Sequence, residues 1–229
     1  MVNNIPYTII RSNRKTCALY VTEKATVEVR APMKMSKPAI ERFVASKENW
    51  LRTNLAWASA RLAECASFKL DYGSSIILLG KEHTIKAAFG NKISYGENGI
   101  FVPPGLNPDE IKHAVVLMYK AAAKDILTIR TGQIAEMMGV KPAVIKISSA
   151  KTRWGSCSGK HNINYSWRLI MADQDVIDYI IVHELAHIKE HNHSAAFWSI
   201  VQSVMPDYQE KRKKLDLLQE KLNQQDWGE

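Results

Sequence analysis

Four of the seven histidines of this chain lie between positions 183 and 193, and Glu184 follows the first of them. Residues 183–187 therefore read H-E-x-x-H. On a helix, residues four apart lie one turn above each other on one face, so the imidazoles of His183 and His187 can reach the same metal ion. Glu184 then stands beside the first ligand, where its carboxylate can accept the proton of an attacking water. The pattern predicts a metal centre that carries out hydrolysis.

A catalytic zinc site takes three protein ligands and leaves its fourth position open. His191 continues the four-residue spacing, but on a straight helix it would lie a further turn, about 5–6 Å, along the axis. His193 follows Asn192, a residue type that tolerates left-handed backbone and can end a helix. Ser194 can then cap a new helix after the reversal. These features favour His193 over His191 as the third ligand of one zinc ion.

A helix with several histidines can also be only a polar surface. The preceding stretch VIDYIIV, residues 176–182, is strongly apolar, which indicates that the motif lies on a buried helix. A glutamate in such a helix is costly unless it has a partner or a role. These observations favour the metal centre, and the default for His83, His113 and His161 is a structural or exposed histidine.

The elements before the site predict a fold of the α+β class. Alternating apolar residues predict strands over 16–21 and 26–32, followed by a helix over 37–64. Two hairpins are expected over 75–89 and 91–103, with bends at Gly80 and at 96–99. Asn107 is the expected cap of a helix that has Pro108 at its first position and ends at Gly139. We expect an N-terminal β-rich region with one helix over 1–105, and a C-terminal α/β domain over 106–229.

In the C-terminal region, residues 144–150 and 162–170 are expected to form strands, with the loop KTRWGSCSGKH between them. Asp173 or a neighbour caps the helix that carries the histidines. A last amphipathic helix is expected from about residue 205, and its basic run at 211–214 is interpreted as a solvated face.

Composition limits the class of protein. The chain has 229 residues with 46% hydrophobic and 24% charged residues, as expected of a globular protein. The net charge of +8 favours anionic partners. Three widely spaced cysteines argue against a disulfide framework. No signal peptide and no apolar run of roughly 18 residues is recognised, so a cytoplasmic protein without a membrane segment is expected.

The loop 151–161 offers groups for two kinds of substrate. A peptide could add as a further strand along a free edge of the strand at 162–170, with side-chain pockets lined by Trp154, Tyr165 and Trp167. A nucleotide would need cations facing its phosphates, and four surround the same loop: Lys151, Arg153, Lys160 and Arg168. Because the forked guanidinium suits developing negative charge, Arg153 is the candidate for stabilising it in either reaction.

The C-terminal region resembles the YgjP-type metallopeptidase-like family, related in its site to the SprT and WLM zinc metallopeptidases. The matching segments are R-W-G-S-C-S at 153–158, Asn164 with the strand to Leu169, I-D-Y at 177–179, H-E-L-A-H at 183–187, N-H-S at 192–194 and F-W at 197–198. The resemblance covers most of 105–215. It implies a zincin-like domain in which His183, His187 and His193 bind zinc and Glu184 is catalytic.

The resemblance implies the site more closely than the substrate. Peptidase chemistry on a peptide or protein is the preferred expectation. A nucleoside triphosphate pyrophosphatase activity, towards UTP in particular, has also been attached to this type of protein and is the alternative. A basic nucleic-acid-binding protein with a structural zinc is the third hypothesis. It rests on the net charge and on the K-R-K-K run at 211–214, but no known nucleic-acid motif is present.

Overall fold

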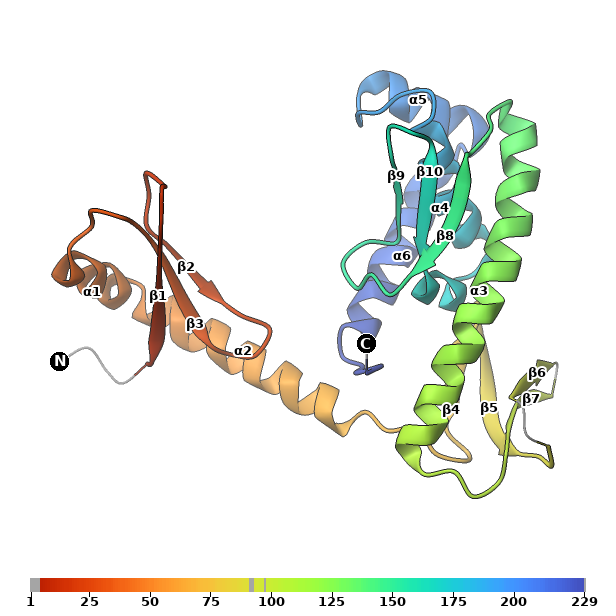
Figure 1. Ribbon diagram of the computed structural model, residues 1–229, viewed down its shortest axis with the longest axis horizontal. Helices are drawn as coiled ribbons and strands as arrows, with labels where there is room; N and C mark the ends of the chain where they lie inside the picture. Colours follow the sequence, from red (N-terminus) through yellow and green to blue (C-terminus); the bar gives the residue numbers. More distant parts are fainter. Residues whose placement is uncertain (1–4, 91–92, 97, 229) are drawn as a thin grey trace. The chain divides into compact units, whose positions relative to one another are not determined.

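The computed structural model describes residues 5–90, 93–96 and 98–228 (Figure 1). By its contacts the chain forms two compact units. Unit 1 comprises Met1–Phe68 and Asn223–Asp226, and unit 2 comprises Lys69–Leu222 and Trp227–Glu229. Each unit combines sheet and helix, so the expected α+β class is confirmed.

Unit 1 is a three-stranded sheet packed against two helices. The strands are β1 (Tyr7–Ser12), β2 (Ala18–Val21) and β3 (Val27–Pro32), in the order β1-β3-β2, with β1 parallel and β2 antiparallel to β3. Alternate residues of β3 face the core, where Val27, Val29 and Ala31 are buried. The helix expected over 37–64 is divided at Lys47 into α1 (Lys37–Ser46) and α2 (Glu48–Ser67).

Unit 2 begins with a four-stranded sheet of two hairpins. Its strands are β4 (Ser75–Leu78), β5 (Lys81–Ala87), β6 (Ser94–Gly96) and β7 (Gly99–Val102), in the order β4-β5-β7-β6. Both bends lie where the glycines predicted them, and residues 91, 92 and 97 of the second hairpin lie outside the described residues.

The long helix α3 (Pro108–Met138) connects this sheet with the rest of unit 2 (Figure 1). Its predicted start is confirmed: the Asn107 side chain accepts from the backbone N–H groups of Asp109 and Glu110, and Glu110 completes the capping box. Gly139 ends the helix in the left-handed conformation, as expected. Buried residues along α3, among them Tyr119, pack against the four-stranded sheet and against the helix that carries the histidines.

Along the chain, the first boundary between the two units follows Phe68. From the sequence we expected a boundary near residue 105. The reason is that the β4–β5 hairpin is bonded to the C-terminal region. The N–H groups of Leu79 and Gly80 donate to the carbonyls of Ile170 and Met171, and the Tyr119 hydroxyl donates to the Ile77 carbonyl. Residue 105 therefore lies inside unit 2.

The second sheet of unit 2 differs from expectation in its order. It consists of β8 (Val144–Ser148), β9 (Gly155–Cys157) and β10 (Asn162–Ser166), in the order β8-β10-β9. The strand predicted over 162–170 thus lies in the middle, and its prediction as a free edge was wrong. It is also shorter, because residues Trp167–Met171 form a 3₁₀ helix. The edge beside β10 is occupied by β9, from a segment that was expected to be a loop.

Three helices complete unit 2: α4 (Gln174–Ala186), α5 (Ala195–Val204) and α6 (Tyr208–Leu222). The basic run on α6 is not simply a solvated face. Lys211 forms ion pairs with Asp175 and Asp207, and Lys214 with Asp173 and Asp175. α6 is thereby held to the start of α4. None of the described helices is long and apolar enough to cross a bilayer.

Candidate metal centre

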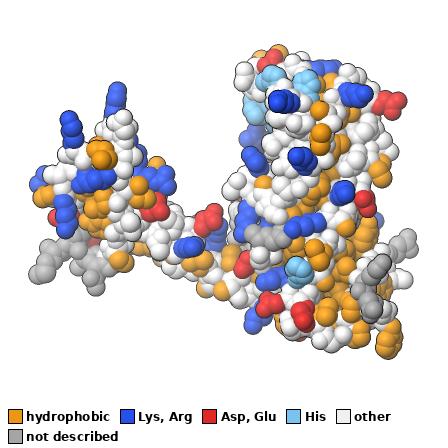
Figure 2. All heavy atoms as spheres, viewed as in Figure 1, with side chains coloured by type: hydrophobic (Ala, Val, Ile, Leu, Met, Phe, Trp, Pro, Cys, Tyr) orange, Lys and Arg blue, Asp and Glu red, His pale blue; other side chains and the backbone are white. Residues whose placement is uncertain are grey.

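Helix α4 carries the H-E-x-x-H motif through the interior of unit 2. It is buried on nearly all sides, with Val176, Ile177, Ile181 and Leu185 in the core, as expected for a helix that is apolar all round. The helix ends at Ala186, so that His187 occupies the position after its last residue. Figure 2 shows histidine side chains gathered at the end of unit 2 where α5 lies.

Three histidines bring their ring nitrogens to one point. One nitrogen from each of His183, His187 and His193 lies within 4.8 Å of the others. The Nε2 atoms of His183 and His193 are 3.1 Å apart. In a tetrahedral zinc site, Zn–N distances of about 2.0–2.1 Å place neighbouring ligand nitrogens roughly 3.3 Å apart. The arrangement fits one zinc ion.

His193 reaches this point because the chain turns after α4. Residues 187–189 form a turn in which the N–H groups of Ile188 and Lys189 donate to the carbonyls of Leu185 and Ala186. The predicted cap of the next helix is confirmed, since the Ser194 hydroxyl accepts from the N–H of Phe197. Asn192 was predicted to end the helix and turn the chain in the left-handed conformation, and this was wrong. α4 ends at Ala186, well before Asn192, and Asn192 is not in the left-handed conformation.

The surroundings of the rings favour the neutral form that metal binding needs. His187 Nδ1 lies 3.1 Å from the Glu190 carbonyl oxygen, which can only accept, so Nδ1 carries the proton and Nε2 keeps its lone pair. Burial, followed by the charges of His187, His193 and Arg212, lowers the pKa of His183 to about 3. Burial also lowers the pKa of His187. Both imidazoles are therefore neutral at pH 7.

Phe197 forms the floor of the cluster. Its ring centroid lies 4.9, 4.5 and 4.8 Å from the rings of His183, His187 and His193, and its side chain is fully buried. One apolar side chain thus packs against all three imidazoles and limits how their rings can turn. From the sequence, Phe197 was noted only as part of a segment that resembles the family, and no role was predicted for it.

Glu184 is buried next to the histidines, with only 5% of its surface exposed. Its Oε2 has no hydrogen-bond partner within the described residues, and neither has the buried Nδ1 of His183. Burial raises the pKa of Glu184 to about 8, and the positive charge of Arg153 opposes this rise. A buried carboxylate oxygen without a protein partner is rare, and it fits a group that binds a water molecule beside a metal.

Gly155, the first residue of β9, lies directly against this carboxylate. A Cβ atom at this position would be 2.5 Å from Glu184 Oε1 and 2.7 Å from its Cγ. The glycine therefore leaves the space that the glutamate occupies, and β9 and α4 approach closely here. A glycine inside a strand often marks such an approach, and this signal was present in the sequence.

Other residues predicted around the loop 151–161 lie differently. Tyr165 and Trp167 do not line a substrate pocket, because both are fully buried and Trp167 stacks on Tyr119. Arg168 does not face the solvent: it is 6% exposed, donates to the Ser149 carbonyl and lies over the Trp167 ring. Arg153, by contrast, is exposed.

His191 lies apart from the cluster of three. It is exposed on the segment between α4 and α5, and its ring centroid is 6.5 Å from that of His161. The set of ligand-type side chains that the structure brings together is thus the set favoured by the sequence, with His191 outside it.

Three imidazoles beside a buried glutamate, next to a three-stranded sheet, have the arrangement of a metallohydrolase centre. The chain belongs to the YgjP-like metallopeptidase domain family, whose model matches residues 15–217. Membership of this family implies a divalent metal, typically zinc.

Two solved structures are similar to part of the chain. One is the metallopeptidase zymogen abylysin of Pyrococcus abyssi, at 24% identity and a TM-score of 0.38, covering 43% of this chain and 97% of that one. The other is the zymogen jannalysin of Methanocaldococcus jannaschii, at 22% identity and a TM-score of 0.36, covering 41% and 95%. No curated protein matches the chain.

Proposed function

We propose that this chain is a zinc-dependent peptidase in which His183, His187 and His193 hold one zinc ion and Glu184 is the general base. The observation that carries the proposal is the convergence of three ring nitrogens within 4.8 Å, beside a buried carboxylate with an unpartnered oxygen. Membership of a metallopeptidase family supports a peptide or protein as the substrate.

The chemistry follows from the groups around this point. His183, His187 and His193 would hold a zinc ion that would supply Lewis-acid chemistry, polarising the scissile carbonyl and lowering the pKa of water. Glu184 accepts the proton of the attacking water and passes it to the leaving amine. Burial raises the pKa of Glu184 to about 8, and the positive charge of a zinc ion at the three histidines would lower it again, which favours the carboxylate form that accepts the proton.

The edge strand β9 is the proposed binding surface for the peptide backbone. Within the described residues β9 pairs only with β10, through Gly155–Cys157, so its other edge has free N–H and carbonyl groups. A peptide that pairs with this edge would run alongside α4, since Gly155 contacts Glu184. Recognition by strand addition is therefore kept, but with β9 in place of β10.

Arg153 is the proposed group for stabilising the oxyanion. It immediately precedes Trp154 and β9, is exposed, and lies close enough to Glu184 for its charge to act on that carboxyl. A guanidinium just before the binding strand, whose charge acts on the general base, is suited to negative charge that develops on the carbonyl oxygen.

The two other hypotheses lose support from particular residues. The nucleotide hypothesis relied on four cations, and one of them, Arg168, is buried, where it donates to the Ser149 carbonyl and lies over the Trp167 ring. The nucleic-acid hypothesis relied on the basic run of α6, where Lys211 and Lys214 are paired with carboxylates of α4 and its surroundings. Lys151, Arg153 and Lys160 remain exposed, so triphosphates are included in the test.

The proposal is tested by a parallel screen of the zinc-loaded full-length chain. Unstructured peptides and proteins are offered in one arm and nucleoside triphosphates, including UTP, in the other. We expect peptide cleavage that is lost when a chelator removes the metal and regained when zinc is restored. Metal-dependent release of pyrophosphate without cleavage of any peptide would reject the peptidase.

The contact between Gly155 and Glu184 yields a prediction for this activity. Gly155→Ala is expected to lower kcat/KM about 100-fold, because the new methyl group must displace the glutamate, and a misplacement of about 1 Å costs that much. Metal content is expected to stay at one ion per chain. Gly159→Ala, with nothing within 4 Å of its added Cβ, is the matched control and should retain activity. Equal activity of the two variants would show that Glu184 is not held by β9.

A further inference from the structure

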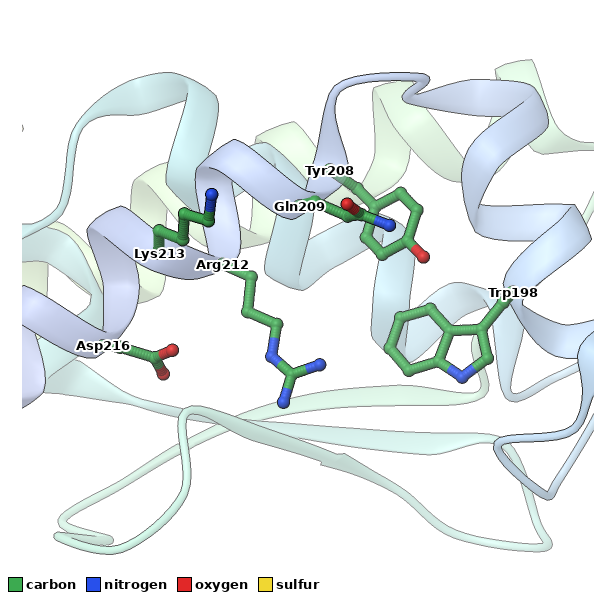
Figure 3. Close-up of a pocket in the computed structure, with 6 residues that line it drawn as sticks. All are labelled: Trp198, Tyr208, Gln209, Arg212, Lys213 and Asp216. Atoms are coloured by element: carbon green, nitrogen blue, oxygen red, sulfur yellow. The ribbon is translucent and has the colours of Figure 1, made fainter.

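A pocket of about 450 Å³ opens beside the histidines, between α5 and α6 (Figure 3). Its lining combines an aromatic wall with charged side chains: Trp198, Tyr208, Gln209, Arg212, Lys213 and Asp216. In Figure 3 the indole of Trp198 and the ring of Tyr208 lie next to each other, and the guanidinium of Arg212 points from α6 into the open space.

Ring contacts connect the pocket with the metal centre. The Trp198 centroid lies 5.8 Å from that of His193, and the nearly parallel Tyr208 ring lies 5.2 Å beyond Trp198. The Tyr208 ring is therefore separated from His193 by at most the length of about three residues of extended chain. A peptide held at the metal can therefore reach the pocket.

Arg212 differs from its neighbours in the basic run. Lys211 and Lys214 face the start of α4, where Lys211 pairs with Asp175 and Lys214 with Asp173 and Asp175. Lys211 also pairs with Asp207, one turn earlier in the chain. Arg212 makes no ion pair with any residue that the structure describes, and the same is true of Lys213. Successive residues of a helix point about 100° apart, so one run of cations serves two surfaces. Lys211 and Lys214 hold α6 to α4, whereas Arg212 and Lys213 leave their charges available in the pocket.

We infer that this pocket is a substrate subsite in which Arg212, with Lys213, binds a carboxylate of the peptide within about three residues of the scissile bond, while Trp198 and Tyr208 pack against the chain that carries it. This inference rests on the proposed peptidase function. It adds the substrate class, which is peptides with an acidic side chain or a free C-terminus close to the cleavage point.

The lining fits a carboxylate better than a triphosphate. Two cations share the pocket with the carboxylate of Asp216, so the lining has a net charge that balances one negative group but not the several charges of a triphosphate. Guanidinium groups bind carboxylates through two parallel hydrogen bonds. The aromatic wall suits the apolar part of a side chain or the flat face of a peptide unit.

The test measures binding separately from cleavage. Zinc-loaded Glu184→Gln protein, which is expected to bind without cutting, is titrated with peptide pairs that differ by Glu or Gln at one position, scanned along the peptide. A second set compares a free C-terminal acid with its amide. One acidic position, or the free acid, should bind roughly five- to tenfold tighter than its neutral twin. Which set shows the preference identifies the source of the carboxylate.

The preference is expected to disappear in Arg212→Gln and to reverse in Arg212→Glu toward peptides with Lys at the same position. Lys221→Gln changes an exposed cation on the same helix, outside the pocket, and should keep the wild-type preference. The absence of any carboxylate preference, its persistence in Arg212→Gln, or an Arg212-dependent displacement of the peptide by UTP would each overturn the subsite.

The outcomes for the subsite and for the peptidase remain separate. If wild type cleaves peptides but discriminates no acidic twin, the subsite is rejected and the peptidase stands. If Glu184→Gln protein binds acidic twins through Arg212 but wild type cleaves nothing, the peptidase is rejected and the pocket stands as a carboxylate-binding site.

Discussion

Glu184→Gln is expected to lower kcat/KM for peptide cleavage by about 10²–10⁴, the usual contribution of a positioned general acid–base group. Glutamine keeps the shape of the side chain but cannot accept a proton. Because the added amide group replaces an oxygen that has no protein partner, the fold should tolerate the change. The measurement is cleavage kinetics together with metal content and thermal unfolding.

The control for this prediction is the metal itself. Glu184→Gln protein should still carry one zinc ion, since the three proposed ligands are histidines and Glu184 is not one of them. A variant that loses its metal would mean that Glu184 is a ligand, and a fully metallated variant that keeps wild-type activity would remove it from the mechanism.

The second large effect concerns the histidines. His183→Ala, His187→Ala and His193→Ala are each expected to reduce bound zinc well below one ion per chain, because a three-nitrogen site that loses one ligand retains only two protein ligands. Metal analysis of the purified variants, followed by titration with a competing chelator, measures the loss. Activity should fall in parallel.

His191→Ala is the matched control, since it removes an exposed imidazole from the same segment. It should retain one zinc ion and its activity. A fully metallated His193→Ala protein together with a depleted His191→Ala protein would show that the third ligand is His191, and that the segment between α4 and α5 rearranges when metal binds.

Local periodicity made much of the candidate site predictable. On any helix, the spacing of four residues places the side chains of His183 and His187 on the same face, whatever packs around that helix. Similarly, Asn107, Glu110 and Gly139 define the two ends of α3 through hydrogen bonds within a few residues. The choice of His193 was favoured by a chain reversal, and such a reversal exists, although turns after Ala186 produce it rather than Asn192.

The missed features depend on contacts between distant segments. The residues Trp167–Met171 have the composition of a strand, but the Ser166 hydroxyl accepts from the Arg168 N–H and starts a 3₁₀ helix that buries Trp167 and Arg168. β9 has only three residues, and Gly-Ser-Cys shows no apolar alternation. Arg212 lies in a run of four consecutive cations, and the sequence does not distinguish it from its neighbours. Its place in the pocket depends on how α6 packs beside the metal centre.

The same short strand has a consequence for self-association. An unpaired edge is open to any extended chain, including another copy of this one, and long flat edges are templates for aggregation. β9 pairs over only Gly155–Cys157, and its serine and glycine give an incoming strand little apolar surface to bury. A chain added there gains a few backbone hydrogen bonds and little else. The edge would therefore bind an added chain weakly, which would limit polymerisation and, in the proposed peptidase, would let cleaved chains leave.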